Sequence, residues 1–170
     1  MNRTWPPDTI QQSAFPLPGF PANSLAEGAS GLSLTVLFTT ATATLRALWR
    51  GEELANELGA RIRILVPHVV PYPLPLDRPQ VDPEFKIRPL RSVSIADAVG
   101  IRIDVLLCRD PSIAIAQSLS SQSVVLIGGR ERWWPTREKR LAKFLIFAGH
   151  HVIWVPADRD VPSQPINAAT

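Results

Sequence analysis

The sequence has a single cysteine, Cys108, and this scarcity excludes two kinds of structure. One thiol cannot form an internal disulfide, and it cannot supply a metal site that needs several cysteines. The sequence also has no apolar run of the roughly 18 residues that a membrane-spanning helix needs, so we expect no membrane partner. Residues 1–31 lack the apolar segment of a secretory signal. Together these features predict a cytoplasmic protein.

Residues that carry catalysis or bind metals are also few. The three histidines, His68, His150 and His151, do not have the spacing of a metal site, and we expect no metal. There is no serine in a nucleophile elbow and no pair of carboxylates placed for acid-base chemistry, so we predict no catalytic residues and no enzyme. Cys108 at a strand end is expected to be a small buried residue. The alternative is a reactive thiol, which needs an electropositive neighbour to lower its pKa.

Proline, in contrast, is abundant, and its distribution divides the chain. The 17 prolines concentrate in residues 1–31, in 67–89 and after residue 155. We therefore predict a flexible Pro-rich N-terminal arm over 1–31, one domain over 32–156 and a flexible tail over 157–170. The alternative for the arm is that it docks on a partner through its aromatic residues Trp5, Phe15 and Phe20.

Five short apolar stretches within the domain are typical of buried strands. They cover residues 34–40, 61–66, 101–108, 123–129 and 151–155. Helical patterns lie between them, over residues 44–58, 84–99, 112–120 and 136–148. This alternation predicts an α/β fold made of right-handed β-α-β units, with a single open parallel sheet and helices on both faces.

The helix ends carry their own signals. Thr42 or Thr44 is predicted to cap the first helix, and Gly59 to end it. Asp110 is predicted to cap the third helix, whereas Pro89 should kink or interrupt the second. The last helix is predicted to bury one apolar face, formed by Leu141, Phe144, Leu145 and Ala148.

In an open parallel sheet, ligands bind beyond the carboxyl ends of the strands where the strand order reverses. For the order 3-2-1-4-5, that reversal lies between the first and fourth strands. The loops at this point contain the candidate ligand-binding residues Thr39, Thr40, Thr42, Gly128, Gly129, Arg130, Arg132, Trp133, Trp134, Thr136 and Arg137. The segment 128–147 has six Lys or Arg residues against two Glu, a net charge of +4, while the whole chain has +3.

Four stretches of the sequence resemble the universal stress protein family. They are LTVLFTTATAT, ILVPHVVPYP, CRDPSIAIAQ and VVLIGGRERWW followed by KRLAKFLIFAGHHVIWVP, and the likeness covers residues 33–156. It implies the five-stranded order 3-2-1-4-5. Family members that bind ATP carry an acidic residue after the first strand and a Gly-x2-Gly-x9-Gly-[Ser/Thr] motif after the fourth, whose glycines let backbone N–H groups approach the phosphates.

The present sequence departs from that motif. Gly128 occupies the first glycine position, but Glu131 occupies the second and Leu141-Ala142 the last pair, while Thr39 or Thr40 stands at the acidic position. We therefore expect a non-enzymatic regulatory or adaptor protein without ATP binding of the family type and without a cofactor. The alternative is a nucleotide or small-anion binding protein with a rebuilt Arg/Trp site at the ends of the first and fourth strands.

The two adjacent tryptophans leave three interpretations open. Trp133 and Trp134 can form a structural lid beside a solvated basic face, a surface for a protein partner, or an aromatic platform for a small anionic ligand such as ATP or another adenine nucleotide. The first two leave no ligand in the crevice. The modest net charge and the absence of a nucleic-acid module predict no nucleic-acid partner.

The last apolar stretch ends the sheet, and an uncovered strand edge favours pairing with a second copy. We therefore predict a homodimer. Its interface is expected at His151, Val152, Ile153, Trp154 and Val155.

Overall fold

The computed structural model describes residues 9–14, 32–77, 79, 81–82, 84–91, 101–131, 133 and 136–157. Strands and helices alternate along this part of the chain. In order they are β1 (Thr9–Ala14), β2 (Ser33–Leu37), α1 (Ala41–Leu58), β3 (Arg61–Val69), α2 (Glu84–Arg91), β4 (Ile101–Cys108), α3 (Pro111–Ser118), β5 (Val124–Gly129), α4 (Arg137–Phe147) and β6 (His151–Pro156). No helix within the described residues combines the length and the apolar character that a membrane crossing requires.

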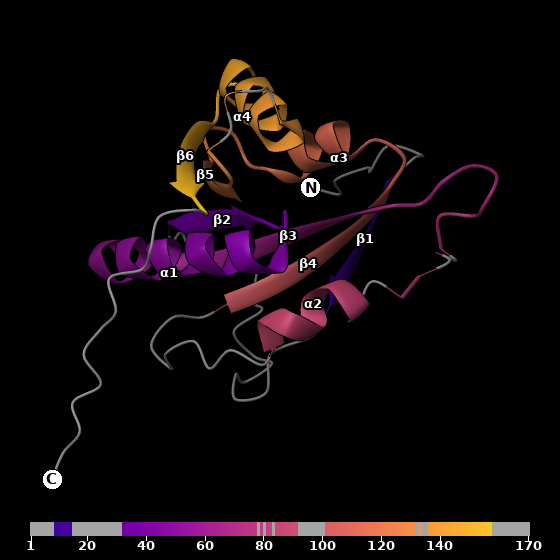
Figure 1. Ribbon diagram of the computed structural model, residues 1–170, viewed down its shortest axis with the longest axis horizontal. Coiled ribbons are helices and arrows are strands. Elements are labelled where there is room, and N and C mark those ends of the chain that lie inside the picture. The colour runs from indigo at the N-terminus through magenta and orange to yellow at the C-terminus, as the bar shows by residue number, and fades with distance from the viewer. Residues whose placement is uncertain are drawn as a thin grey trace, which may run out of the picture.

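The strands form one sheet in the order β1-β4-β3-β2-β5-β6 (Figure 1). The five strands from β4 to β6 are parallel, and their order is the predicted 3-2-1-4-5, which is confirmed. The order reverses between β2 and β5, so the carboxyl ends of these two strands meet at the predicted place.

The sheet has a sixth strand that the sequence analysis did not predict. β1 lies in the segment interpreted as a flexible arm, and it pairs antiparallel with β4, from Thr9 opposite Cys108 to Ala14 opposite Ile103. Its sequence, TIQQSA, has no apolar run. Such a strand adds to an open edge through backbone hydrogen bonds, which leave little pattern in the sequence. The other residues of the arm, and the tail after Ala157, lie outside the described residues.

Two apolar cores lie on opposite faces of the sheet. α1 and α2 cover one face, where Val36, Ile64 and Leu126 are buried, and α3 and α4 cover the other, where Leu37, Leu65 and Ile127 are buried (Figure 1). Successive residues of a strand point to opposite faces, so strands covered on both sides are largely apolar. This explains the unbroken apolar run of β5, whereas charged residues alternate with isoleucines at the start of β3 and of β4.

α1 begins earlier than its sequence predicted. Thr40 is the N-cap, and its Oγ1 accepts a hydrogen bond from the amide of Ala43 at 3.3 Å. The prediction of Thr42 or Thr44 as the cap is therefore wrong. Thr44 is buried in the first turn instead, where its Oγ1 accepts from the amide of Thr39 at 3.1 Å. Gly59 ends the helix with φ of 61°, as predicted.

The helices α2 and α4 differ from their predictions in extent and in buried face. Pro89 does not interrupt α2, which ends at Arg91, and residues 92–99 of the predicted helix lie outside the described residues. On α4 the buried residues are Ala142 and Leu145, whereas Phe144 is 41% exposed and Ala148 is exposed. The inner face thus contains Leu145 and the partly buried Leu141, as predicted, together with Ala142 in place of Phe144 and Ala148.

Candidate functional site

A crevice of about 530 Å³ lies at the carboxyl ends of β2 and β5, between the first turns of α1 and α4. Seven of the predicted candidate residues meet there: Thr39, Thr40, Thr42, Gly128, Gly129, Arg130 and Thr136. Ala43, Glu138 and Ala157 also line the crevice, and the sequence analysis did not predict them. The reversal of strand order therefore brings together the two loops that the sequence indicated.

Gly128 is held against the backbone of α1. A Cβ atom at this position would overlap the carbonyl group of Ala43, in the first turn of that helix. The hydroxyl of Thr39 donates a hydrogen bond to the carbonyl oxygen of Gly128 at 2.8 Å. Thr39 thus joins the end of β2 to the end of β5.

The crevice is polar and carries charge of both signs. Thr40 and Thr136, which cap α1 and α4, both line it, so the positive ends of two helix dipoles face the same space. Among the described lining residues, Arg130 adds a positive charge and Glu138 a negative one. This arrangement favours a small anion or phosphate group at the helix ends, and Glu138 limits the charge that the crevice accepts.

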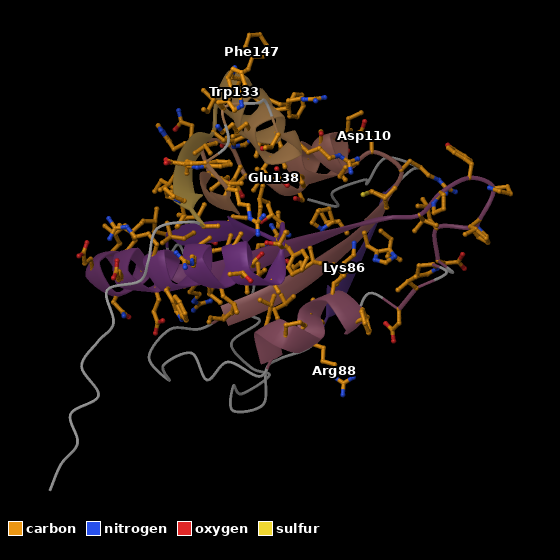
Figure 2. All side chains as sticks on the ribbon, in the orientation of Figure 1. Lys86, Arg88, Asp110, Trp133, Glu138 and Phe147 are labelled. Carbon is orange, nitrogen blue, oxygen red and sulfur yellow. The ribbon has the colours of Figure 1, made fainter. Side chains whose placement is uncertain are left out.

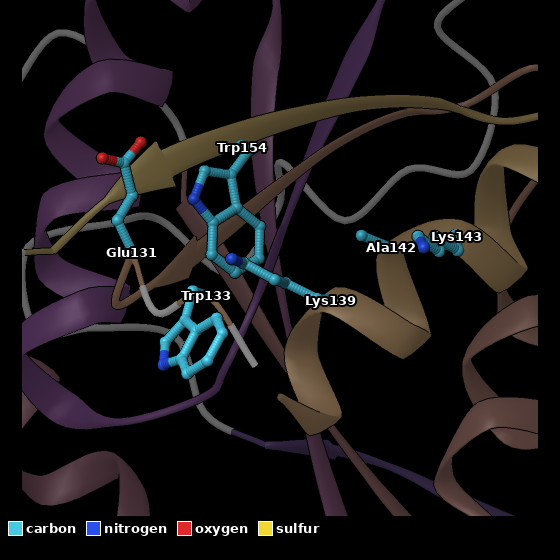
Figure 3. A pocket seen from close by; sticks show the side chains of 6 residues that line it. All are labelled: Glu131, Trp133, Lys139, Ala142, Lys143 and Trp154. Atoms are coloured by element: carbon cyan, nitrogen blue, oxygen red, sulfur yellow. The ribbon is translucent and has the colours of Figure 1, made fainter. Parts of the chain in front are cut away.

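A second hollow, which we call the indole groove, lies beside the crevice on the α4 side of the sheet. It has a volume of about 520 Å³ and is lined by Glu131, Trp133, Lys139, Ala142, Lys143 and Trp154. Figure 3 shows the side chains of Trp133, Trp154 and Lys139 pointing toward one another. Trp133 is 86% exposed. The groove thus combines two aromatic surfaces with two lysines and one carboxylate.

Trp154 occupies its place in the groove because Gly129 lacks a side chain. A Cβ atom at residue 129 would overlap the indole ring of Trp154. Trp154 was predicted only at a dimer edge, and its part in the groove was not predicted. A usable signal was present, because a glycine in an apolar strand often marks close approach of a neighbouring group.

The interpretation of the tryptophan pair as a cap over the crevice does not agree with the position of Trp133. Its side chain lines the indole groove, and the lining of the crevice does not include it. Arg132 and Trp134 lie outside the described residues, and the exposed Arg137 lines neither hollow. The loop after β5 runs between the two hollows, so the side chains that follow Gly129 divide between them.

A third group of ionisable residues lies at the carboxyl ends of β3 and β4. His68 is only 6% exposed, and among the described residues its Nδ1 has no hydrogen-bond partner. Burial, and then the positive charge of Lys86, lowers the pKa of His68, whereas Asp82 acts in the opposite direction. Burial also lowers the pKa of Lys86, whose Nζ donates to the carbonyl oxygen of Pro67 at 3.3 Å.

Cys108 belongs to the same group and is fully buried, as the sequence predicted. Burial, followed by the negative charge of Asp110, raises its pKa to about 11. A thiolate is the reactive form of cysteine, so this thiol is inert at neutral pH. Asp110 caps α3, with its carboxylate accepting from the amides of Ser112 and Ile113 at 2.8 and 3.1 Å, which confirms that prediction.

A buried ion cluster on β4 was not found from the sequence. Asp104 is fully buried and accepts from Arg63 Nε at 2.5 Å and from Arg102 Nε at 2.8 Å. Arg63 also donates to the carbonyl oxygen of Ser118 at 3.0 Å, so it holds the C-terminal end of α3. Within the described part of the chain, no group of three His, Cys, Asp or Glu residues is placed to hold a metal ion.

No protein-family model matches the sequence, and no curated protein matches it. Among solved structures, the chain is similar to a protein of the universal stress protein family from Burkholderia pseudomallei, with 18% sequence identity and a TM-score of 0.46. The similarity covers 76% of this chain and 98% of that chain. The fold described above rests on the pairing of this chain's own strands.

Proposed function

We propose that the chain is a universal-stress-protein-like, non-enzymatic regulatory or adaptor protein that forms a homodimer through the outer edge of β6. The observation that supports the dimer most is the position of this strand. Among the described strands, β6 is the last of the sheet and pairs with β5 alone. An open apolar edge is a template for another strand, and a two-fold axis pairs the same strand of two copies.

The backbone N–H and C=O groups of β6 point alternately toward β5 and toward the open edge of the sheet. The amides of His151 and Ala157 donate to the carbonyl oxygens of Ser123 at 3.0 Å and Gly129 at 2.8 Å. In a strand, alternate residues point their backbone groups to opposite sides. The amides of Val152 and Trp154 therefore face outward, where a second copy can accept them. Pro156 follows at the next outward position and has no amide to donate, which limits the paired length.

The side chains of β6 favour the same interface. Val152, Ile153, Trp154 and Val155 are each half-buried, with Ile153 and Val155 packed toward the α1 side and Val152 and Trp154 toward the α4 side. A strand added at this edge would cover the remaining apolar surface on both faces of the sheet. Burial of that surface stabilises a dimer by about 25 cal/mol per Å².

A proline at residue 152 tests the interface without disturbing the sheet. The Val152→Pro change removes an outward amide and leaves the hydrogen bonds to β5 in place, whereas Val152→Ala shortens the side chain and keeps the amide. By light scattering at tens of micromolar, we expect the wild type and Val152→Ala to have twice the 18.7 kDa mass of one chain, and Val152→Pro the mass of one. A wild-type protein with the mass of one chain would refute the dimer.

A second candidate function is the binding of a nucleotide or small anion in the crevice. It is favoured by the two helix N-termini that meet there together with Arg130. Against family-type ATP binding stand Glu131 at the second glycine position and the carboxylate of Glu138 on the crevice wall. We therefore propose that the crevice accepts at most a small anion, that the protein needs no cofactor, and that it performs no hydrolysis.

Calorimetric titration with ATP, AMP and inorganic phosphate separates the two functions. Binding in the crevice should be lost in Arg130→Ala and kept in Arg50→Ala, which removes a cation on the outer side of α1. If ATP binds with micromolar affinity through Arg130, the nucleotide-binding function replaces the adaptor. If none of the three binds, only the adaptor proposal remains.

A further inference from the structure

The outer face of α4 combines positive charge with exposed aromatic rings. Arg140, Lys143, Phe144 and Phe147 recur at the i, i+3, i+4 and i+7 positions of one helix face, and all four are exposed. Phe147 is 94% exposed, the highest value among the large apolar side chains described. Figure 2 shows Phe147 and Trp133 at the same end of the molecule. We call these four residues the α4 stripe.

The α4 stripe is continuous with the indole groove. Lys143 belongs to both, and Lys139, one turn earlier on the helix, lines the groove between the two indoles (Figure 3). The combined surface extends over the nine residues from Lys139 to Phe147, about 12 Å of helix. Clustered apolar side chains that remain in water usually mark an interaction site, and single ones do not.

We propose that the α4 stripe and the indole groove together bind an acidic peptide segment of a partner protein that carries an aromatic or large aliphatic anchor. Carboxylates of such a segment would pair with Arg140 and Lys143, and its anchor would enter the groove against Trp133 and Trp154. The inference deepens the adaptor function, on which it rests, by stating the chemistry of the partner.

Charge decides against a second copy as the occupant. α4 carries Arg137, Lys139, Arg140 and Lys143 against one carboxylate, that of Glu138. Two such helices side by side repel each other, whereas an acidic segment neutralises the excess charge. Trp133 and Trp154 line an open, shallow hollow that the anchor side chain of a peptide can fill.

Phage display on the full chain tests the proposal with a library of random 12-residue peptides. We expect the selected peptides to be acidic and to share an aromatic or large aliphatic residue. The double variant Arg140→Glu/Lys143→Glu should select neutral or basic peptides from the same library, because the charge of the α4 stripe is reversed. Selected peptides without an acidic bias, or an unchanged selection with the double variant, would overturn the proposal.

A peptide selected on the wild type, made synthetically, then measures the contribution of the aromatic ring. Phe147→Ser should weaken its binding by about tenfold or more, as expected when an anchor in an interface is lost. Phe85→Ser is the matched control, because Phe85 is 72% exposed on α2, on the other face of the sheet, and its loss should leave binding unchanged. Equal losses in both variants would contradict the proposed surface.

Two further outcomes separate this inference from the dimer and from a membrane. If the protein is monomeric and binds the peptide, the dimer is refuted and the α4 surface is supported. If the protein is dimeric and selects no peptide, the dimer is supported and the peptide-binding surface is refuted. Vesicles of phosphatidylcholine with and without phosphatidylserine are tested by co-sedimentation. Binding to the anionic vesicles that depends on Phe147, with no peptide selected, would assign the surface to lipid and overturn the proposal.

Discussion

Gly128 and Gly129 are neighbours at the end of β5, yet they make room for different groups. Gly128 faces α1 and touches the backbone of Ala43, whereas Gly129 faces the α4 side and touches the indole ring of Trp154. Successive residues of a strand point to opposite faces, so a dipeptide that lines the crevice also leaves room for the Trp154 ring of the indole groove. Gly128 therefore packs against main-chain atoms, and Gly129 packs against a side chain.

This difference determines how much each hollow can adapt. A main-chain wall that is part of a helix cannot move without moving α1, and the hydrogen bond from Thr39 fixes Gly128 from β2. A side-chain wall can rotate, and the indole groove is lined by the side chains of Trp133, Lys139 and Trp154. The crevice is therefore the rigid hollow and the indole groove the adaptable one.

The largest effect is expected for Gly128→Ala. The added methyl group would overlap the Ala43 carbonyl, and relief requires a shift of α1 against the sheet. Overpacking of this kind should lower the free energy of unfolding by about 3 kcal/mol. Urea denaturation followed by circular dichroism measures it. A loss below about 1 kcal/mol would show that the wall of the crevice is not rigid.

Gly129→Ala should cost less, about 1 to 2 kcal/mol, because the Trp154 ring can turn away. The cost should fall further in a Trp154→Phe background, where the smaller ring leaves room for the methyl group. A double-mutant cycle in urea gives the coupling between the two positions. If the coupling free energy between residues 129 and 154 is indistinguishable from zero, Gly129 is required for a reason other than contact with the Trp154 ring.

Thr39→Val removes the hydroxyl that joins the ends of β2 and β5 and keeps the side chain nearly the same size. The carbonyl oxygen of Gly128 loses a partner at 2.8 Å, so we expect a loss of about 1 kcal/mol in the free energy of unfolding. Thr39→Ser retains the hydroxyl and is the control. Equal stability of the valine and serine variants would show that the hydrogen bond contributes nothing.

The smallest effect concerns pH and should arise outside both hollows. Because burial and Lys86 lower the pKa of His68 below its ordinary value of 6.5, the unfolded chain binds a proton more readily than the folded one. Stability is then fully present above pH 6.5 and falls as the pH decreases toward the folded pKa. The difference between the free energies of unfolding at about pH 7.5 and pH 5.5 should shrink in His68→Gln. If the difference in the free energy of unfolding between the two pH values is the same in His68→Gln as in the wild type, protonation of other groups causes the loss of stability.

The sequence predicted the parallel strands because strands covered on both faces are largely apolar, of which Val124 to Gly129 is the clearest. Their order was implied by the family resemblance. The sequence also predicted Gly59 and Asp110 as helix ends, since each satisfies backbone groups within its own turn. It did not predict β1, whose pairing with β4 depends on backbone groups, or the cap at Thr40.

Some features of the candidate site were also predicted from the sequence, and others were not. Its loops were predicted, because the position of a crevice follows from strand order. The direction of Trp133 and the contact between Gly129 and Trp154 were not, because they depend on packing between residues far apart in the sequence. The buried cluster of Asp104 with Arg63 and Arg102 was missed for that reason too.

Hydrogen exchange of the β6 amides, followed residue by residue by NMR, tests the proposed dimer most directly. The amides of Ile153 and Val155 face β5, and those of Val152 and Trp154 face outward. We predict that all four are protected at high protein concentration and that dilution exposes only Val152 and Trp154. Fast exchange of Val152 and Trp154 at every concentration, with Ile153 and Val155 protected, would contradict a dimer through this edge.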